Sequence, residues 1–108
     1  DGALRILGRA DQVIVSGGEN VDPRRVEEVI VSHPGVRLAA VAAVPDLEWG
    51  EKVVAVYEGE ADPEALDAWV RERLAPYEVP RMWRRVPAVP LNPAGKPDPE
   101  RVRELFET

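Results

Sequence analysis

The sequence contains no cysteine and only one histidine, His33, among its 108 residues. Disulfide bonds, thiolate metal sites and clusters of imidazole ligands are therefore excluded. No apolar run approaches the roughly 18 to 20 residues that a membrane-spanning helix needs. No charged segment followed by an apolar stretch and a cleavage site opens the chain. These absences predict a cytoplasmic protein with no membrane span and no metal site of its own.

Lysine is also scarce: Lys52 and Lys96 are the only two among 14 basic residues, against 20 acidic ones. The net charge is −6, and the arginines are interleaved with glutamate and aspartate. A continuous basic patch is the usual mark of nucleic-acid binding, so we expect no nucleic-acid partner. A small anionic nucleotide can still bind at a site where a few basic side chains make the local charge positive.

Three Asp-Pro pairs divide a chain whose length fits one domain. An aspartate carboxylate accepts the unpaired N–H groups of a first helical turn, and proline suits the first helical position. Apolar residues at i, i+3 and i+4 follow each pair, which is the spacing of a one-sided helix. The pairs therefore predict helices over 23–32, 63–74 and 99–107.

Runs of β-branched residues occupy the segments between these helices. They predict short strands over 4–7, 13–15 and 82–86, and longer strands over 36–44 and 53–57 with a loop at 45–50. The segment 87–97 contains four prolines together with Asn92 and Gly95, so it is predicted to be an exposed, extended loop. The predicted fold class is α+β, with a small central β-sheet and about three helices packed on it.

Lys96 lies in this proline-rich segment. Gly95 gives the backbone freedom, and Pro97 biases Lys96 toward an extended conformation. A lysine on such a loop is a mobile cation on a long stem, which suits a group that reaches a phosphate or carboxylate in another domain's cleft. Taken alone, however, the segment fits a solvated surface lysine better.

Gly17 and Gly18 stand between a predicted strand and a predicted helix. Paired glycines let a ligand or another backbone approach closely, and the helix N-terminus that follows has a positive dipole end. The segment predicts either a contact surface for a ligand chain or a tight β-to-α turn. It is not a phosphate-binding loop of the Gly-Lys-Ser/Thr type.

Arg9 and Asp11 lie where two predicted strands meet. Locally, a surface ion pair in a turn is the simpler interpretation. His33 precedes Pro34 and Gly35 at a predicted helix end, where it is expected to cap carbonyl groups or face solvent.

Taken in order, these segments resemble the motifs of adenylate-forming enzymes. That superfamily includes acyl-CoA synthetases, the adenylation domains of non-ribosomal peptide synthetases and firefly luciferase. The run GRADQVIVSGGENVDPRRVE at 8–27 resembles a family signature, and PLNPAGK at 90–96 resembles the family's last motif. Four shorter segments between these runs resemble the family's connecting motifs: HPGV at 33–36, VPD at 44–46, WGE at 49–51 and YEVP at 77–80. The resemblance covers essentially the whole chain.

The resemblance implies a two-step reaction and a role for each matching residue. A carboxylate attacks the α-phosphate of ATP to give an acyl-adenylate and pyrophosphate, and a thiol, usually that of CoA, then displaces AMP. Lys96 matches the lysine that bridges the two anions in the first step. Asp11 matches the hinge about which the small domain rotates, and Arg9 would lie beside the nucleotide. Gly17 and Gly18 match the loop that faces the pantetheine arm in the second step.

The same resemblance implies a division into domains. Residues 1–11 would be the end of the linker and hinge from a large N-terminal domain, and residues 12–108 would be the C-terminal small, or lid, domain. ATP and Mg²⁺ would be bound mainly by the large domain, with CoA and a carboxylic acid as the other substrates. We therefore expect the 108-residue chain alone to have no synthetase activity.

Two positions depart from the commoner pattern: Gln12 replaces a frequent aspartate, and Pro97 replaces an aliphatic residue and stiffens the lysine loop. The compact form most resembles o-succinylbenzoate–CoA ligase of menaquinone synthesis. Two alternatives stay open, an adenylation domain that loads a carrier protein and a non-catalytic small-domain binding module. The retention of Lys96 after Gly95 argues against the second.

Overall fold

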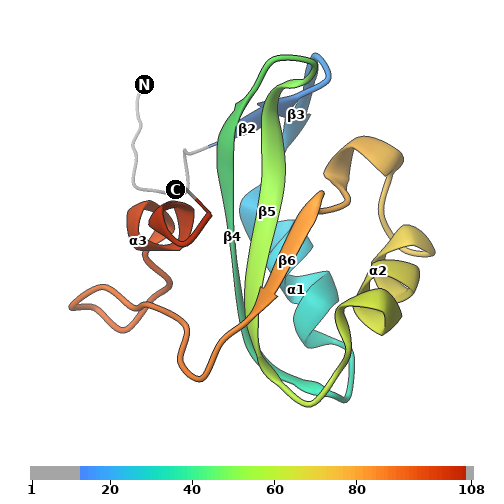
Figure 1. The fold of residues 1–108 in the computed structure, drawn as a ribbon. Helices are drawn as coiled ribbons and strands as arrows, with labels where there is room; N and C mark the ends of the chain where they lie inside the picture. The colour runs from blue at the N-terminus through green and yellow to red at the C-terminus, as the bar shows by residue number, and fades with distance from the viewer. Residues whose placement is uncertain (1–12, 107–108) are drawn as a thin grey trace.

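A mixed five-stranded β-sheet forms the centre of the computed structural model, which describes residues 13–106 (Figure 1). Its strands are β2 (Ile14–Ser16), β3 (Glu19–Val21), β4 (Val36–Asp46), β5 (Gly50–Gly59) and β6 (Met82–Arg85). The order is β3-β2-β5-β4, and β6 pairs in parallel with β5 while the other pairs are antiparallel. The strand predicted over 4–7 lies outside the described residues.

Within residues 13–106, three α-helices and one 3₁₀ turn accompany the sheet. These are α1 (Pro23–Val31), α2 (Pro63–Arg71), η2 (Pro76–Glu78) and α3 (Pro99–Glu104). Each α-helix begins at the proline of an Asp-Pro pair, as predicted, and the α+β class is confirmed. The carboxylates of Asp22 and Asp98 accept first-turn N–H groups, whereas Asp62 makes no such side-chain bond. None of the described helices is long and apolar enough to span a membrane.

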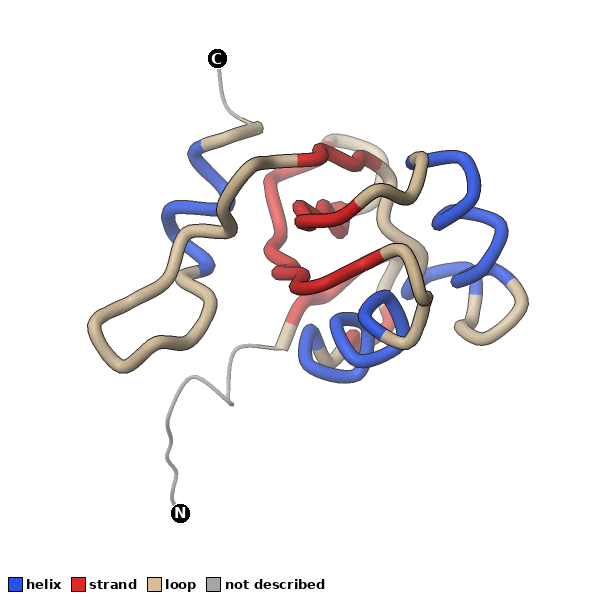
Figure 2. The backbone as a smooth tube through the Cα atoms, turned by 90° about the horizontal axis from the view of Figure 1, so that it is seen from below, coloured by secondary structure: helices blue, strands red, loops and turns tan. Residues whose placement is uncertain are grey.

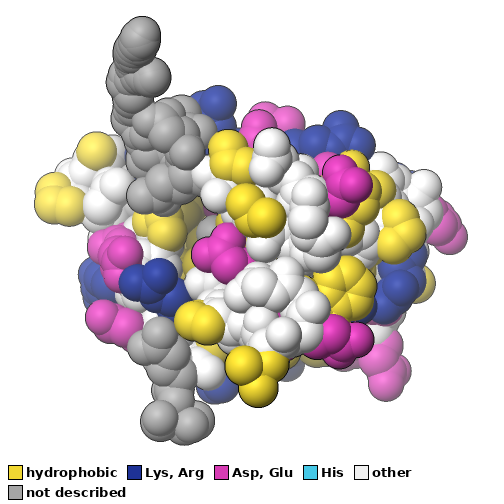
Figure 3. Space-filling view, turned by 90° about the horizontal axis from the view of Figure 1, so that it is seen from above, with side chains coloured by type: hydrophobic (Ala, Val, Ile, Leu, Met, Phe, Trp, Pro, Cys, Tyr) yellow, Lys and Arg dark blue, Asp and Glu magenta, His cyan; other side chains and the backbone are white. Residues whose placement is uncertain are grey.

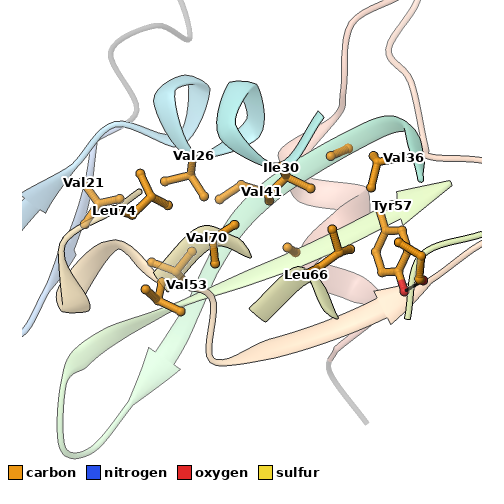
Figure 4. Packing of buried hydrophobic residues seen from close by; sticks show 14 of the residues in the cluster. Val21, Val26, Ile30, Val36, Val41, Val53, Tyr57, Leu66, Val70 and Leu74 are labelled. Atoms are coloured by element: carbon orange, nitrogen blue, oxygen red, sulfur yellow. Dashed lines mark hydrogen bonds between the residues drawn. The ribbon is translucent and has the colours of Figure 1, made fainter. Parts of the chain in front are cut away.

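The helices cover both faces of the sheet, with α1 and α2 on one side and α3 on the other (Figures 1 and 2). Alternate residues of β4 therefore enter two different cores: Ala39 and Val41 face α1 and α2, while Ala40 and Ala42 face α3. A strand buried on both faces has a continuous apolar sequence, which explains the run at 36–44. Figure 4 shows the larger core, where residues of α1 and α2 interdigitate with Val41, Val53 and Tyr57.

The prediction of a loop over 45–50 is wrong in extent, because β4 continues to Asp46 and β5 begins at Gly50. The residues between these strands form a three-residue turn. Pro45 is accommodated because β4, among the described strands, pairs with β5 alone, and an edge strand tolerates a missing N–H donor. Gly50 supports the turn with a φ of +82°.

The His33 side chain caps no carbonyl among the described residues and is only half-exposed; the bond to a helix carbonyl, that of Ile30 at 3.1 Å, comes from its backbone N–H. Its Nδ1 accepts the backbone N–H of Gly35 at 2.9 Å, and its half-buried ring packs edge-to-face on Trp69 with ring centroids 4.8 Å apart. The interpretation from the sequence was therefore wrong. The histidine shapes the α1–β4 turn, and Pro34 and Gly35 complete that turn.

Candidate functional site

The segment that carries Lys96 is exposed, as predicted, but it is a closed turn and not an extended loop. Asn92 donates its backbone N–H to the carbonyl of Lys96 at 2.7 Å, and Gly95 donates to the carbonyl of Asn92 at 2.9 Å. Below the turn, Leu91 and Pro97 form a β-bridge. The chain thus reverses between Asn92 and Lys96, and Gly95 permits this with a φ of +83°. Prolines at the flanks limit the strand pairing to a single bridge.

The Lys96 side chain is exposed and belongs to no ion pair among the described residues. It lines a cavity of about 480 Å³ together with Asn92 and Pro97 from the same turn. Other lining residues come from β2, β4, β5, α1 and α3, and include Arg24 and Glu51. Figures 1 and 2 show this turn beside α3 at the periphery of the domain. The Lys96 ammonium is therefore accessible from outside the domain.

The glycine pair forms a β-hairpin turn, so the predicted β-to-α turn is wrong. Strand β3 lies between the turn and α1, and Ser16 pairs with Glu19 across the turn. Gly17 and Gly18 have φ values of +62° and +82°, which define a hairpin turn that favours glycine at both positions. The helix N-terminus therefore does not follow the glycines directly, and the exposed glycine backbone itself forms the surface.

The two glycines have different surroundings. A Cβ atom on Gly17 would lie 2.8 Å from Cε3 of Trp49, whereas a Cβ atom on Gly18 would meet nothing within 4 Å. The backbone N–H of Gly17 also donates to the carbonyl of Trp49 at 2.9 Å. Gly17 therefore joins the β2–β3 turn to the β4–β5 turn, and Gly18 is the glycine that leaves open space for a ligand.

Trp49 holds the two turns together in an arrangement that sequence reasoning missed. The guanidinium carbon of Arg81 lies 4.0 Å from its ring centroid, so the ring contacts both Arg81 and Gly17. The carboxylate of Asp46 accepts the N–H groups of Glu48 and Trp49 at 2.8 and 2.9 Å. The spacing of Asp46 and Trp49 could have indicated a side-chain-stabilised turn. The contact between Trp49 and Gly17 has no local sequence signal.

The β4–β5 turn is expected to loosen at acid pH. The backbone N–H groups of Trp49 and Glu48, with smaller contributions from Lys52 and Arg81, hold the pKa of Asp46 below its ordinary value. Because the folded-state pKa is the lower one, the stabilisation is complete above about pH 4 and is lost as pH falls through the folded-state pKa. In an NMR titration, the Trp49 amide signal should stay constant from pH 7 to about 4 and shift below it. A midpoint above pH 4 would contradict this assignment.

The structure does not bring the two glycines and Lys96 together. In Figure 1 the β2–β3 turn lies at the top of the domain and the Lys96 turn at its lower left. Arg9 and Asp11 lie outside the described residues. On the face shown in Figure 3, the described acidic and basic side chains are intermixed, without a continuous basic surface. The domain thus presents two separate candidate surfaces, one cationic and one formed by glycine backbone.

The fold is that of a small α+β domain, with the exposed lysine turn and the glycine hairpin as its two candidate surfaces. The chain belongs to the AMP-binding enzyme C-terminal domain family, whose model matches residues 25–96. It is 42% identical over 98 residues to a 2-succinylbenzoate–CoA ligase of Bacillus licheniformis, covering 89% of this chain and 20% of that protein. The chain spans about a fifth of the length of the curated relatives it matches.

Solved structures show the same fold. The amide bond synthetase McbA from Marinactinospora thermotolerans superposes with a TM-score of 0.82 at 45% identity, covering 87% of this chain and 20% of that one. ATP-bound MatB from Rhodopseudomonas palustris superposes with a TM-score of 0.84 at 31% identity, covering 93% of this chain and 21% of that one.

Proposed function

We propose that this chain is the C-terminal small domain of an AMP-forming acid–thiol ligase. In the first half-reaction a carboxylate oxygen attacks the α-phosphorus of ATP, an acyl-phosphate bond forms, and pyrophosphate leaves. In the second, the thiol of CoA attacks the acyl carbon, a thioester forms, and AMP leaves with the bonding electron pair while the thiol proton goes to solvent. The supporting observation is an exposed lysine that has no ion-pair partner within residues 13–106, held on a closed turn remote from the glycine hairpin.

Each residue has a distinct role in the proposed reaction. The Lys96 ammonium neutralises charge where the carboxylate and the α-phosphate meet. Asp11 is the hinge for domain rotation, and Arg9 contacts the nucleotide at the domain junction. Gly17 and Gly18 flank the path of the pantetheine arm in the second half-reaction. A large N-terminal domain supplies the binding of ATP and Mg²⁺ and the acyl pocket, and the enzyme acts in the cytoplasm.

The separation of the two surfaces supports a rotation of the small domain between half-reactions. One rigid domain cannot place both the lysine turn and the glycine hairpin at the same reacting carbon, because they lie at different ends of the domain (Figure 1). Rotation about a hinge presents each surface in turn, which is a form of conformational gating.

The substrate proposed is o-succinylbenzoate, in menaquinone biosynthesis. The likeness to 2-succinylbenzoate–CoA ligases supports it. The test is ATP–pyrophosphate exchange by the full-length enzyme with a panel of carboxylic acids that includes o-succinylbenzoate. Exchange driven by that acid supports the proposal. Exchange driven by another acid corrects the substrate, and no exchange with any acid favours the non-catalytic binding module.

The acceptor in the second half-reaction needs a separate test, because one structural neighbour is an amide bond synthetase. The acyl-adenylate should be offered CoA, a carrier protein with a phosphopantetheine thiol, and a simple amine. Thioester formation with CoA supports the acid–thiol ligase. Preferential loading of the carrier protein supports the adenylation-domain alternative, and preferential amide formation shows that the acceptor is an amine.

Gly17→Ala is expected to impair the second half-reaction selectively. Its Cβ atom would lie 2.8 Å from the Trp49 ring, so the ring and the hairpin must move apart, and the pantetheine path is distorted. We expect thioester formation from pre-made acyl-adenylate to fall by about 10-fold or more, with pyrophosphate exchange within about twofold of the wild type. Single-turnover assays of each half-reaction measure both. An equal fall in the two rates would contradict the role of this hairpin.

A further inference from the structure

One side chain, that of Asn92, forms hydrogen bonds with the backbone of the Lys96 turn. Its Oδ1 accepts the backbone N–H of Ala94 at 2.9 Å and the backbone N–H of Lys96 at 3.1 Å. The backbone of Asn92 closes the same turn through its own N–H and carbonyl, which bond to Lys96 and Gly95. Both backbone polar groups of Lys96 therefore bond to Asn92.

The base of the turn is held independently of Asn92. Leu91 and Pro97 form a β-bridge, and the N–H of Asp98 donates to the carbonyl of Pro90 at 3.0 Å. The nearby N-terminus of α3 is capped by the Asp98 carboxylate. A change at Asn92 should therefore leave the position of the turn in the domain unchanged.

The tip of the turn has little other support. Pro93, Ala94, Gly95 and Lys96 are all exposed, and a Cβ atom added to Gly95 would meet nothing within 4 Å. Side-chain packing therefore does not define the conformation of the tip, and hydrogen bonds to Asn92 must do so. An Asn side chain that accepts backbone N–H groups in this way supplies hydrogen bonds that strand pairing would otherwise provide.

We propose that Asn92 is a positioning residue that sets the place and direction from which the Lys96 side chain extends. This inference rests on the proposed function of Lys96 in adenylation. The lysine ammonium is at the end of a flexible four-carbon stem, so its effective concentration at a phosphate depends on a fixed Cα position. Without the Oδ1 acceptor, the Ala94 and Lys96 N–H groups lose their partner and only the two backbone bonds of Asn92 close the turn, so the Lys96 backbone is less firmly held and the ammonium is less often in place.

The variants are Asn92→Ala, which removes the acceptor, and Asn92→Asp, which keeps an oxygen at the same place. Pro93→Ala is the matched control, because Pro93 is exposed on the same turn and its side chain has no group that can form a hydrogen bond. In the full-length enzyme, Asn92→Ala should lower kcat for pyrophosphate exchange by about 10- to 100-fold with KM for ATP within about threefold. Asn92→Asp should recover most of the rate, and Pro93→Ala should stay within about twofold of the wild type.

Thioester formation from pre-made acyl-adenylate separates positioning from a general structural effect. It should be within about twofold of the wild type in all three variants. Unchanged exchange in Asn92→Ala, an equal loss in both half-reactions, or failure of Asn92→Asp to recover the rate would each overturn the proposal.

A second measurement does not depend on the reaction. In the 108-residue chain, Asn92→Ala should raise the hydrogen-exchange rates of the Ala94 and Lys96 amides by about 10-fold or more, with core amides unchanged. If the full-length wild type shows no pyrophosphate exchange with any acid, the proposed function fails, and this measurement still decides whether Asn92 fixes the turn. Unchanged amide exchange at Lys96 would overturn the positioning role in either case.

Discussion

Replacing Lys96 with alanine in the full-length enzyme is expected to lower pyrophosphate exchange by about 100-fold or more. The ammonium group stabilises a transition state in which two anions approach each other, and no other cation is carried by the turn at 92–96. Thioester formation from pre-made acyl-adenylate should stay within about twofold of the wild type, because the glycine hairpin and not the lysine turn serves that step. Single-turnover assays of the two half-reactions measure both rates.

The chain contains a matched control for this experiment. Lys52 is the only other lysine, and its Nζ lies 3.9 Å from Asp46 Oδ2 in an ion pair beside the β4–β5 turn. Lys52→Ala removes the same charge from the domain without touching the turn at 92–96, so pyrophosphate exchange should remain within about twofold. An equal fall in both alanine variants would show that net charge, and not the position of Lys96, is responsible. A similar loss of both half-reactions in Lys96→Ala would reject the assigned role.

The sequence predicted the helices well because each one carries its own start signal. The Asp-Pro pairs fix where the helices begin, and the apolar spacing fixes which side is buried, for example through Val26 and Ile30 of α1. Both signals are local and need no knowledge of the rest of the chain. Helix ends were less accurate: α2 stops at Arg71, although apolar spacing continues to Leu74, which is buried outside the helix.

The candidate site was only partly predictable, because its geometry depends on contacts between distant segments. Gly95 and Lys96 could be found from a short motif. The hydrogen bonds to Asn92 could not, because they require the chain to reverse direction, and the prolines predicted an extended segment instead. Likewise, nothing near Gly17 indicates that Trp49, 32 positions later, packs on its Cα. The β3 strand was missed since three residues with little apolar character give no periodic signal.

Among the glycines of residues 13–106 outside the two candidate surfaces, Gly59 is the one whose replacement by alanine is expected to destabilise the domain most. A Cβ atom at this position would lie 2.1 Å from the carbonyl oxygen of Gly35 and 2.9 Å from Cα of Val36. Both contacts are with backbone, so no side-chain rotation relieves them. The φ of Gly59 is +143°, which adds strain for any residue with a Cβ atom.

The clash also breaks a hydrogen-bonded connection between β5 and α2. The carbonyl of Gly35 accepts the N–H of Ala61 at 3.1 Å, and the carbonyl of Ala61 accepts the buried Tyr57 hydroxyl at 2.6 Å. Burial raises the pKa of Tyr57, so the hydroxyl remains a donor throughout the ordinary pH range. Gly59 pairs with Val36 at the end of the sheet, next to these bonds. Moving the Gly35 backbone away from Gly59 therefore disrupts them.

We expect Gly59→Ala to lower the free energy of unfolding by about 3 kcal/mol or more and the midpoint of thermal unfolding by about 15 °C. Gly18→Ala is the matched control: its φ is +82° but its Cβ atom meets nothing within 4 Å, so it should cost about 1 kcal/mol from backbone strain alone. Denaturant and thermal unfolding of the 108-residue chain measure both. Equal destabilisation by the two variants would show that φ strain, and not the close approach of Gly35 to Gly59, determines the requirement for glycine.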